Sequence, residues 1–354
     1  GHEVVQHYAQ NPADVGTAAG ALSRSIWNTG AARAVGDVVR RTRPELAHVH
    51  NTWFALTPAI LPAIRAAGVP VVMTLHNYRL VCVNGFLFRA GRPCLDCVGT
   101  HPGHGVVHRC YKDSYFASAM LAGTVGLHSR RGTWATNVNT FVVLSQAARQ
   151  LFVASGLPAE RLLVKPNFTE DPGPRELPPS ASREVLFVGR LDRVKGISLL
   201  VEAWNSLSTT DLKLVVVGDG EQRRALERVA GPSIELVGWS PREAVRRRMQ
   251  RARALVFPSV THDPFGLVVL EAMATGLPVL ATDLGGAPET LGSSGMIVPA
   301  HDVGALAEGC RRLADDALVD DLGARNRRRY EDHYTPAANL PLLEAVYSSV
   351  LADW

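Results

Sequence analysis

The sequence has no apolar segment long enough to cross a membrane. Hydrophobic residues make up 46% of its 354 positions, yet no apolar run reaches the ~18 residues of a transmembrane helix, and no secretory signal is evident. Charged residues account for 20% of the chain, which is ordinary for a globular enzyme. We therefore expect a cytoplasmic protein that works in solution or at the inner face of the membrane.

Cysteine is also scarce, with five residues in the chain. Disulfide-stabilised folds belong to exported proteins, so this count indicates a reducing compartment.

The net charge of +4 is not accompanied by aromatic side chains interleaved with basic ones, so we expect no nucleic-acid partner. Arginines cluster at 40–43, 130–131, 246–248 and 327–329. Solvated helix faces explain such clusters most simply. Peripheral contact with anionic lipid, or contact with substrate phosphate, is the alternative.

Short β-branched segments alternate with helical patterns along the whole chain. We predict parallel strands at 47–50, 71–75, 140–144, 162–165, 185–188, 212–217, 234–237, 254–257 and 278–281. A Pro-rich segment, Thr169 to Ser182, interrupts the series and is typical of a linker or hinge. The predicted fold class is α/β, with two doubly wound Rossmann-like domains facing across a cleft.

The predicted boundaries follow from this pattern. An N-terminal domain covers 1–168, a linker 169–183, a second domain 184–334, and a final helix 335–354. A doubly wound domain begins with a strand and a glycine-rich turn, whereas residues 1–7 are typical of the approach to a second strand. We therefore expect the first strand, its turn and the first helix to be missing.

Two cations follow the first strand of the second domain. The loop from Gly189 to Gly196, GRLDRVKG, contains Arg190 and Lys195 between glycines that let the backbone turn and approach a ligand. In the predicted sheet both cations lie at the carboxyl end of a strand, where a diphosphate would bind. A turn with two surface cations is the alternative.

The most informative segment is PSVTHDPFGLVVLEAMATG, residues 258–276. Asp263 and Glu271 lie eight positions apart, on either side of the expected start of a buried helix. The backbone amides of Phe265, Gly266 and Leu267 would lie at that helix N-terminus, which favours an anion. Such a segment offers backbone amides that can bind a phosphate and two carboxylates that can bind hydroxyl groups. This combination suits a nucleotide sugar.

Two further turns end neighbouring strands. In the first, Gly218 and Asp219 indicate close approach of the backbone to a ligand, although a plain turn explains them equally well. In the second, Trp239 either lines a base pocket or packs on the surface.

With these motifs in order, the chain resembles glycosyltransferase family 4, retaining enzymes of the GT-B fold. The resemblance runs from about Ala47 to Tyr334 and rests on four motifs, each placed after a predicted strand. They are the G-R-L-x-x-x-K-G loop, the V-G-D-G turn, the G-x-x-P segment, and the two acids eight apart that end in E-A-M-A-x-G-x-P-V.

The resemblance implies a role for each residue. Gly189, Arg190 and Lys195 would hold the donor diphosphate, and Glu271 would accept hydrogen bonds from the ribose hydroxyls. Asp263 would contact the transferred sugar, where the family usually has Glu. The final helix would cross back to the first domain.

In the first domain, His76 ends a predicted strand and resembles the family histidine that faces the donor sugar and β-phosphate. His50 ends the previous strand, and we expect it on the acceptor side with Asn77 and Arg79. Packing at a strand end is the alternative for each histidine.

The implied reaction is front-face transfer with retention, in which the leaving diphosphate takes the proton of the acceptor hydroxyl. Catalysis would then depend on positioning and on electrostatic stabilisation by His76, Asp263, Arg190 and Lys195. We expect no catalytic metal or other cofactor.

Four of the five cysteines, Cys82, Cys94, Cys97 and Cys110, fall in one glycine-rich segment. A structural zinc site is one interpretation, and reduced packing thiols or disulfides are the others. The segment resembles an insertion in family 4 enzymes that build exopolysaccharide or other cell-surface glycans.

The predicted function is therefore transfer of a sugar from a nucleotide-diphosphate sugar to a hydroxyl of a glycan, lipid-linked or small-molecule acceptor. A sugar-nucleotide epimerase of the same fold and a non-catalytic sugar-nucleotide-binding protein are the alternatives. The sequence does not distinguish donor sugars, nucleotide bases or acceptors.

Overall fold

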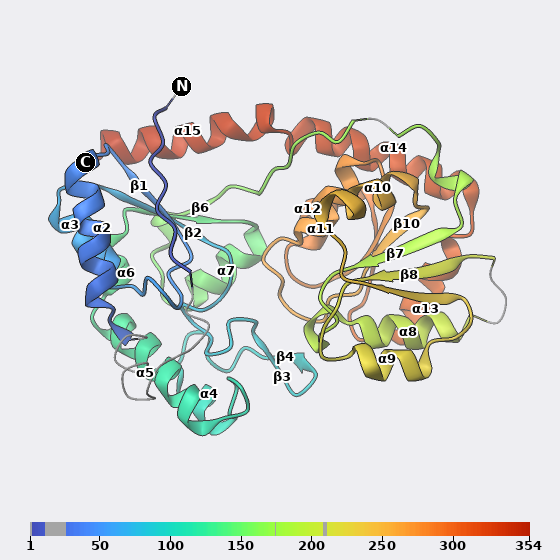
Figure 1. Cartoon of the computed structure of the whole chain (residues 1–354), viewed down its shortest axis with the longest axis horizontal. Coiled ribbons are helices and arrows are strands. Elements are labelled where there is room, and N and C mark those ends of the chain that lie inside the picture. Colours follow the sequence, from blue (N-terminus) through green and yellow to red (C-terminus); the bar gives the residue numbers. More distant parts are fainter. Residues whose placement is uncertain (1, 11–25, 174, 208–210) are drawn as a thin grey trace.

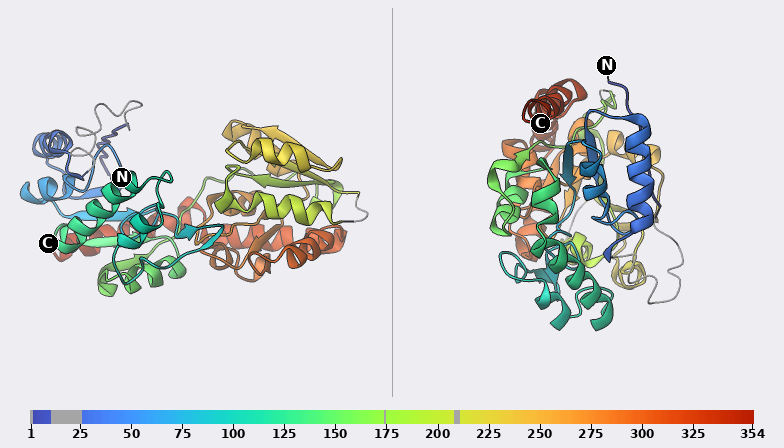
Figure 2. Two further views of the ribbon diagram at one scale, coloured as in Figure 1. Left: turned by 90° about the horizontal axis from the view of Figure 1, so that it is seen from below. Right: turned by 90° about the vertical axis from the view of Figure 1, so that its left-hand side faces the viewer.

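The structure is a computed structural model that describes residues 2–10, 26–173, 175–207 and 211–354. Two lobes lie end to end, and each is built around a parallel sheet (Figures 1 and 2). All the predicted strands are present, with ends that differ by no more than one residue. The predicted fold class is confirmed.

The first sheet has the order β1-β2-β5-β6, and every neighbouring pair is parallel. Its strands are β1 (Ala47–His50), β2 (Val71–Leu75), β5 (Thr140–Val143) and β6 (Leu162–Val164). Helices α2 (Thr29–Thr42), α3 (Ile60–Ala66), α6 (Thr133–Asn137) and α7 (Gln146–Ala154) supply the buried apolar side chains of this domain together with the strands. All five residues of β2 are buried, as a central parallel strand requires.

A long insertion separates β2 from β5. It contains a two-stranded antiparallel hairpin, β3 (Phe88–Arg89) and β4 (Arg92–Pro93), followed by α4 (Gly103–Val107) and α5 (Tyr115–Arg130). The hairpin extends from the first domain toward the second (Figure 1). The hairpin was not predicted, since its two strands are too short to show a period. Helix α5 was not predicted either.

The second sheet has the order β12-β11-β10-β7-β8-β9, with all neighbours parallel. Its strands are β7 (Glu184–Val188), β8 (Lys213–Val217), β9 (Ile234–Gly238), β10 (Ala254–Phe257), β11 (Val279–Thr282) and β12 (Met296–Val298). The strand order therefore reverses between β7 and β10, and the crevice at such a switch point is where ligands bind in doubly wound sheets. Strand β12 was not predicted.

Helices cover both faces of this sheet. On one face α8 (Ile197–Asn205), α9 (Arg223–Val229) and α13 (Val303–Arg312) pack against Val185 and Phe187 of β7. On the other, α10 (Arg242–Arg251), α11 (Leu267–Ala274) and α12 (Ala287–Leu291) pack in the cluster that contains Leu186. Alternation along β7 thus divides the core into two layers.

The Pro-rich segment expected to act as a hinge is attached to the second domain along its described length. Asp171 forms a bidentate ion pair with Arg327, with N–O distances of 2.7 and 2.6 Å. The guanidinium of Arg175 donates to the carbonyls of Met249 and Ala252, at 2.8 and 2.5 Å. Local composition predicted a segment with little regular structure, and the 3-10 turn Pro179–Ala181 is its one helical element among the described residues; it did not predict these long-range contacts.

The last two helices run along both domains (Figure 1). Helix α14 (Asp316–His333) packs on the second domain, and α15 (Pro336–Ala352) begins at the N-cap Thr335 and lies against the first sheet. Val346 and Val350 of α15 contact Val72 and Val142. The Tyr347 hydroxyl is 2.7 Å from His48 Nδ1, and His48 Nε2 is 2.7 Å from Thr74 Oγ1.

Residues 2–10 form no regular element, and neither they nor residues 26–46 contain a strand. The sequence predicts that the first strand, its turn and the first helix are missing; residues 1 and 11–25 lie outside the described residues. Among the described helices, none combines the length and the apolar content needed to cross a bilayer.

Arg253 is a fully buried cation whose removal tests the packing of the second domain. Its guanidinium donates to the carbonyls of Ser180, Ser182, Leu313 and Ala314 and pairs with Asp316 at 2.6 Å. Arg253→Leu should lower the free energy of unfolding by about 3 kcal/mol, because buried acceptors lose their donor. Urea denaturation measures this loss, and the exposed Arg251→Leu is the control. Equal losses for both variants would contradict the structural role of Arg253.

Burial of His48 predicts a pH-dependent stability. Burial, and then the charges of His50, His76 and Lys165, lower the pKa of His48 from 6.5 to about 3. Below pH 6.5 the unfolded chain binds a proton at His48 that the folded chain does not bind. The contribution of His48 to the free energy of unfolding is therefore greatest above pH 6.5 and falls as the pH is lowered. From pH 7 to pH 5 the loss due to His48 should be about 2 kcal/mol.

His48→Gln should reduce the difference in unfolding free energy between pH 7 and pH 5 by that amount, whereas the exposed His7→Gln should leave it unchanged. The measurement is urea denaturation at the two pH values. The same pH dependence in wild type and His48→Gln would show that His48 does not titrate abnormally.

Candidate functional site

The loops that follow β7 and β10 touch each other at the switch point of the second sheet. Gly196 has φ +68°, and a Cβ built on it would lie 1.8 Å from the carbonyl oxygen of Pro258. The amide of Val260 donates to the carbonyl of Val194 at 3.1 Å. Only glycine fits at position 196, and the contact brings the two motifs of the sequence into one site.

Lys195 and Asp263 form an ion pair across these two loops. Lys195 Nζ lies 2.6 Å from Asp263 Oδ2, and the side chains are only 23% and 17% exposed. Burial alone would raise the pKa of the Asp263 carboxyl. The charge and hydrogen bond of Lys195, with two backbone amides, outweigh burial and lower that pKa below its ordinary value. Asp263 is therefore held as a carboxylate.

The two backbone amides belong to the start of α11. Asp263 Oδ1 accepts from Gly266 N at 3.0 Å and from Phe265 N at 3.3 Å, and Gly266 has φ +82°. The sequence motif predicts that these amides, with that of Leu267, hold a bound phosphate or sugar. Here the first two instead position the Asp263 carboxylate, because its short side chain folds back onto its own turn.

Arg190 lies on the same side of the sheet but is more exposed. Its side chain is 61% exposed, and its guanidinium pairs with Asp192 at 2.9 Å. Asp192 also accepts from the Lys195 amide at 3.2 Å, and burial raises the pKa of its carboxyl. Sequence reasoning missed Asp192, although an Asp three residues before Lys195 is the pattern of a helical cap.

Glu271 is placed one to two turns into α11 and is half-buried. Its only ion pair among the described residues is with Arg242, at 3.4 Å. Burial raises the pKa of Glu271, and Arg242 opposes that rise. Arg242, at the start of α10, was not predicted, since it lies just beyond the G-x-x-P motif. Trp239 of that motif is 75% exposed, which excludes the packed-tryptophan alternative.

The turn after β8 also approaches the loop after β7. A Cβ on Gly218 would lie 1.8 Å from the carbonyl oxygen of Gly189. Asp219 accepts from the Gly220 amide at 2.7 Å, and Arg223 lies 3.9 Å away. Glycine at position 218 therefore allows the backbone of this turn to lie against the backbone of the loop after β7.

The two histidines predicted in the first domain meet at the carboxyl ends of β1 and β2. His50 Nδ1 and His76 Nε2 are 2.9 Å apart. Burial, followed by the charge of His50, lowers the pKa of His76 to about 4, and burial with the charge of Lys165 lowers that of His50. Both pKa shifts favour the neutral imidazole.

Lys165 was missed by sequence reasoning. It follows β6, it is buried, and its ammonium donates to the carbonyl of Pro166 at 2.9 Å. Burial lowers its pKa to about 8. A lysine directly after a short strand is the only local signal, and it does not distinguish a buried from an exposed side chain.

Asn77 and Arg79 do not join the histidine pair by any hydrogen bond among the described residues. Asn77 accepts from the Arg79 amide at 3.0 Å. The Arg79 guanidinium stacks over the rings of Phe54 and Tyr111, at 5.1 and 5.5 Å, and its buried Nη1 has no hydrogen-bond partner. Its observed contacts are therefore with aromatic side chains of the first domain.

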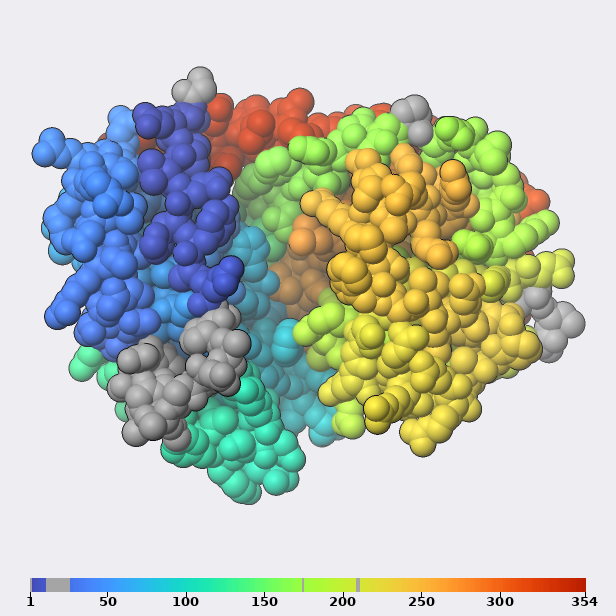
Figure 3. Space-filling model, in the orientation of Figure 1, coloured from blue at the N-terminus to red at the C-terminus, as the bar shows by residue number. Residues whose placement is uncertain are grey.

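The loop after β5 meets the loop after β10, so the carboxyl ends of the two sheets face each other. The surface between the domains is hollowed (Figure 3). Ser145, after β5, donates its hydroxyl to the carbonyl of Pro264 at 2.8 Å, and Thr261 donates to the carbonyl of Phe86. Burial raises the pKa of Tyr78, and the Asp263 carboxylate adds to the rise. Tyr78 of the first domain thus lies within electrostatic reach of Asp263.

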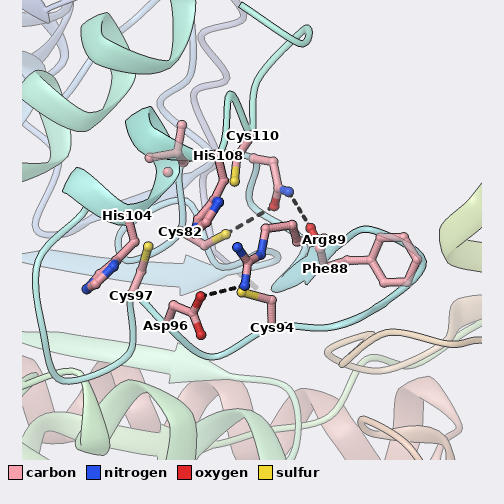
Figure 4. A pocket seen from close by; sticks show the side chains of 12 residues that line it. Cys82, Phe88, Arg89, Cys94, Asp96, Cys97, His104, His108 and Cys110 are labelled. Atoms are coloured by element: carbon pink, nitrogen blue, oxygen red, sulfur yellow. Dashed lines mark hydrogen bonds and ion pairs between the residues drawn. The ribbon is translucent and has the colours of Figure 1, made fainter. Parts of the chain in front are cut away.

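The four clustered cysteines line one small pocket in the insertion, beside His104 and His108 (Figure 4). All four are free thiols. Burial and then the neighbouring cysteines raise the pKa of Cys97 to about 12 and that of Cys110 to about 11. Among the described residues, no three Cys, His, Asp or Glu side chains already have the arrangement of a metal site.

Comparison with known proteins assigns both halves of the chain. Residues 4–167 match the family described as "Glycosyl transferase 4-like domain", and residues 182–316 match "Glycosyl transferases group 1". The 2-deoxystreptamine N-acetyl-D-glucosaminyltransferase of Streptomyces fradiae is 30% identical over 350 residues, covering 91% of this chain and 72% of that protein.

A phosphatidyl-myo-inositol mannosyltransferase of Mycobacterium leprae is 30% identical over 182 residues, so the match spans 48% of this chain and about half (49%) of that protein. Among solved structures, Anabaena HepE, crystallised with UDP and glucose, is 18% identical with a TM-score of 0.65, covering 89% of this chain and 81% of that one. At that identity the likeness shows the fold alone.

Three findings agree on one family. They are the two domain matches, a relative aligned along most of its length, and two Rossmann-like domains with facing carboxyl ends. This chain belongs to the group 1 glycosyltransferases, family 4 enzymes of the GT-B fold.

Proposed function

We propose that the protein transfers a sugar from a nucleotide-diphosphate donor to a hydroxyl group of its acceptor, with retention of anomeric configuration. The observation that carries this proposal is the Lys195–Asp263 pair at the switch point, with Arg190 and Glu271 on the same edge of the sheet. The glycosyltransferase names of the relatives and the UDP in the HepE crystal support it.

The donor diphosphate would bind between Arg190 and Lys195. Each cation is paired with a carboxylate in this structure, Asp192 for Arg190 and Asp263 for Lys195. Because the exposed Arg190 pair is weakly held, its guanidinium can turn to a phosphate at little cost. Lys195 is held at a fixed point, so it would stabilise the charge that develops on the leaving diphosphate.

The nucleoside would lie toward Glu271 and Trp239. Glu271 is half-buried and accepts from no backbone amide among the described residues, so its oxygens are suited to the two ribose hydroxyls. The exposed indole of Trp239 offers a face on which a base can stack.

Asp263 and His76 would act on the sugar itself. Asp263 is held as a carboxylate by Lys195 and two amides, which suits it to orient sugar hydroxyls and to stabilise positive charge on the ring. His76 is neutral, so it can donate one hydrogen bond without adding a charge that would compete for the diphosphate. The leaving diphosphate would itself take the proton of the acceptor hydroxyl.

The acceptor would be a glycan, a lipid-linked glycan or a small molecule. The relatives' names include both a lipid, phosphatidyl-myo-inositol, and a small aminocyclitol, 2-deoxystreptamine. We place the reaction in the cytoplasm, with lipid-linked acceptors reached at the inner membrane face. Histidine and acceptor-side residues come from the first domain, so the acceptor would enter beside His50.

Lys195→Ala tests the diphosphate site. A thermal-shift screen with UDP, GDP and ADP identifies the preferred nucleotide. Loss of a partly buried cation should then weaken the binding of that nucleotide roughly 10- to 100-fold and leave its free nucleoside unaffected. Isothermal titration measures both. The control is Lys213→Ala, at the opposite end of the same sheet. A loss of equal size for nucleoside and diphosphate would contradict the assignment of Lys195.

The stereochemistry of the product tests the reaction. With the donor sugar that the preferred nucleotide carries, NMR of the first product formed should show the anomeric configuration of the donor. His76→Ala should lower kcat much more than it changes KM, because its hydrogen bond strengthens as the diphosphate leaves. An inverted product would rule out retention, and release of an epimerised sugar without transfer would favour the epimerase alternative.

A further inference from the structure

Four cysteines from separate turns of the insertion converge on one void of about 10 Å³, the room of a single small ion or water molecule. Cys82 lies in the turn after β2, Cys94 directly after β4, Cys97 three residues later, and Cys110 after α4. Figure 4 shows the four cysteines around this pocket; Cys82 is buried and the other three are partly buried. The fifth cysteine, Cys310, is buried in α13 of the other domain.

The segment that carries these cysteines has little regular structure. Between residues 82 and 113 the regular elements are two strands of two residues each and the five-residue α4. Five residues there other than glycine have positive φ, between 50° and 53°: Leu87, Ala90, Arg109, Lys112 and Asp113. Such backbone persists only when its surroundings restrain it, and a metal held by the four cysteines would supply one such restraint.

We propose that Cys82, Cys94, Cys97 and Cys110 bind one structural Zn²⁺ ion. Four cysteine ligands with a C-x-x-C pair form a closed tetrahedral site, with Zn–S distances of about 2.3 Å. On binding, four Zn–S bonds form and four thiol protons pass to the buffer. Cys82 Sγ, which donates to Asn84 Oδ1 at 3.0 Å, would exchange that hydrogen bond for the metal.

The site would fix the arm that the first domain extends to the donor loops. The arm, residues 86–93, lies between Cys82 and Cys94. Phe88 packs against Val194 and Val260, on the two loops that carry Lys195 and Asp263. The carbonyl of Phe86 accepts from Thr261, and its ring lies 5.6 Å from the Arg190 guanidinium. Zinc would therefore order the donor loops through the arm, and this consequence rests on the proposed function.

The metal itself is tested without any assay of activity. Full-length protein, purified with a reductant and supplied with Zn²⁺, should hold about one zinc per chain by elemental analysis. Cys97→Ser should lose most of the zinc, while Cys310→Ser should keep it. Cobalt in place of zinc should show an intense thiolate-to-metal absorption in the near ultraviolet, weakened in Cys97→Ser. If Cys97→Ser fails to fold, chelation of the wild-type protein should abolish the absorption and added metal restore it.

Phe88→Ala separates the metal from its consequence. This variant should keep its zinc, while hydrogen exchange at residues 189–196 should rise severalfold, as it should in chelated wild-type protein. The zinc site would be overturned by any of four results. These are folded protein without metal after reconstitution, iron in place of zinc, disulfides among the four cysteines, and unchanged zinc in Cys97→Ser. Retained zinc with unchanged exchange in Phe88→Ala would overturn only the role of the arm.

Discussion

The ion pair between Lys195 and Asp263 is the interaction on which the site depends. It joins two loops whose residues are 68 positions apart in sequence, at the point where the strand order of the second sheet reverses. The same carboxylate holds the turn that begins α11, and α11 in turn carries Glu271. One buried pair therefore sets the positions of a cation, an acid and the helix behind them, and any ligand that binds Lys195 also acts on Asp263.

The first domain contributes neutral groups to this charged edge. His50 and His76 lie at the ends of adjacent parallel strands, and their pKa values are lowered chiefly by loss of hydration. Next to them, His48 forms a hydrogen bond with Tyr347 of α15, the helix that returns from the second domain. Helix α15 therefore contacts β1 at His48, whose ring centroid lies 4.2 Å from that of His50.

A second connection between the domains runs through the insertion. Its hairpin contacts the loops after β7 and β10 by apolar packing at Phe88 and by a hydrogen bond at Phe86. The insertion has little regular structure of its own. Any group that restrains its backbone therefore also stabilises its contacts with those loops. The four-cysteine pocket lies at the base of this hairpin (Figure 4).

The sequence by itself determined the strands, the fold class and the loops that carry the site, because β-branched runs and glycine turns act over a few neighbouring residues. It also pointed to Lys195, Asp263 and Glu271, since short motifs preserve their spacing. Only the tertiary structure decided which groups meet. It paired Lys195 with Asp263, turned two amides of α11 onto that carboxylate, placed Arg79 between aromatic rings, and attached the Pro-rich linker to Arg327. Ion pairs and buried hydrogen bonds join residues far apart in the chain, and their partners are selected by packing, which no local pattern records.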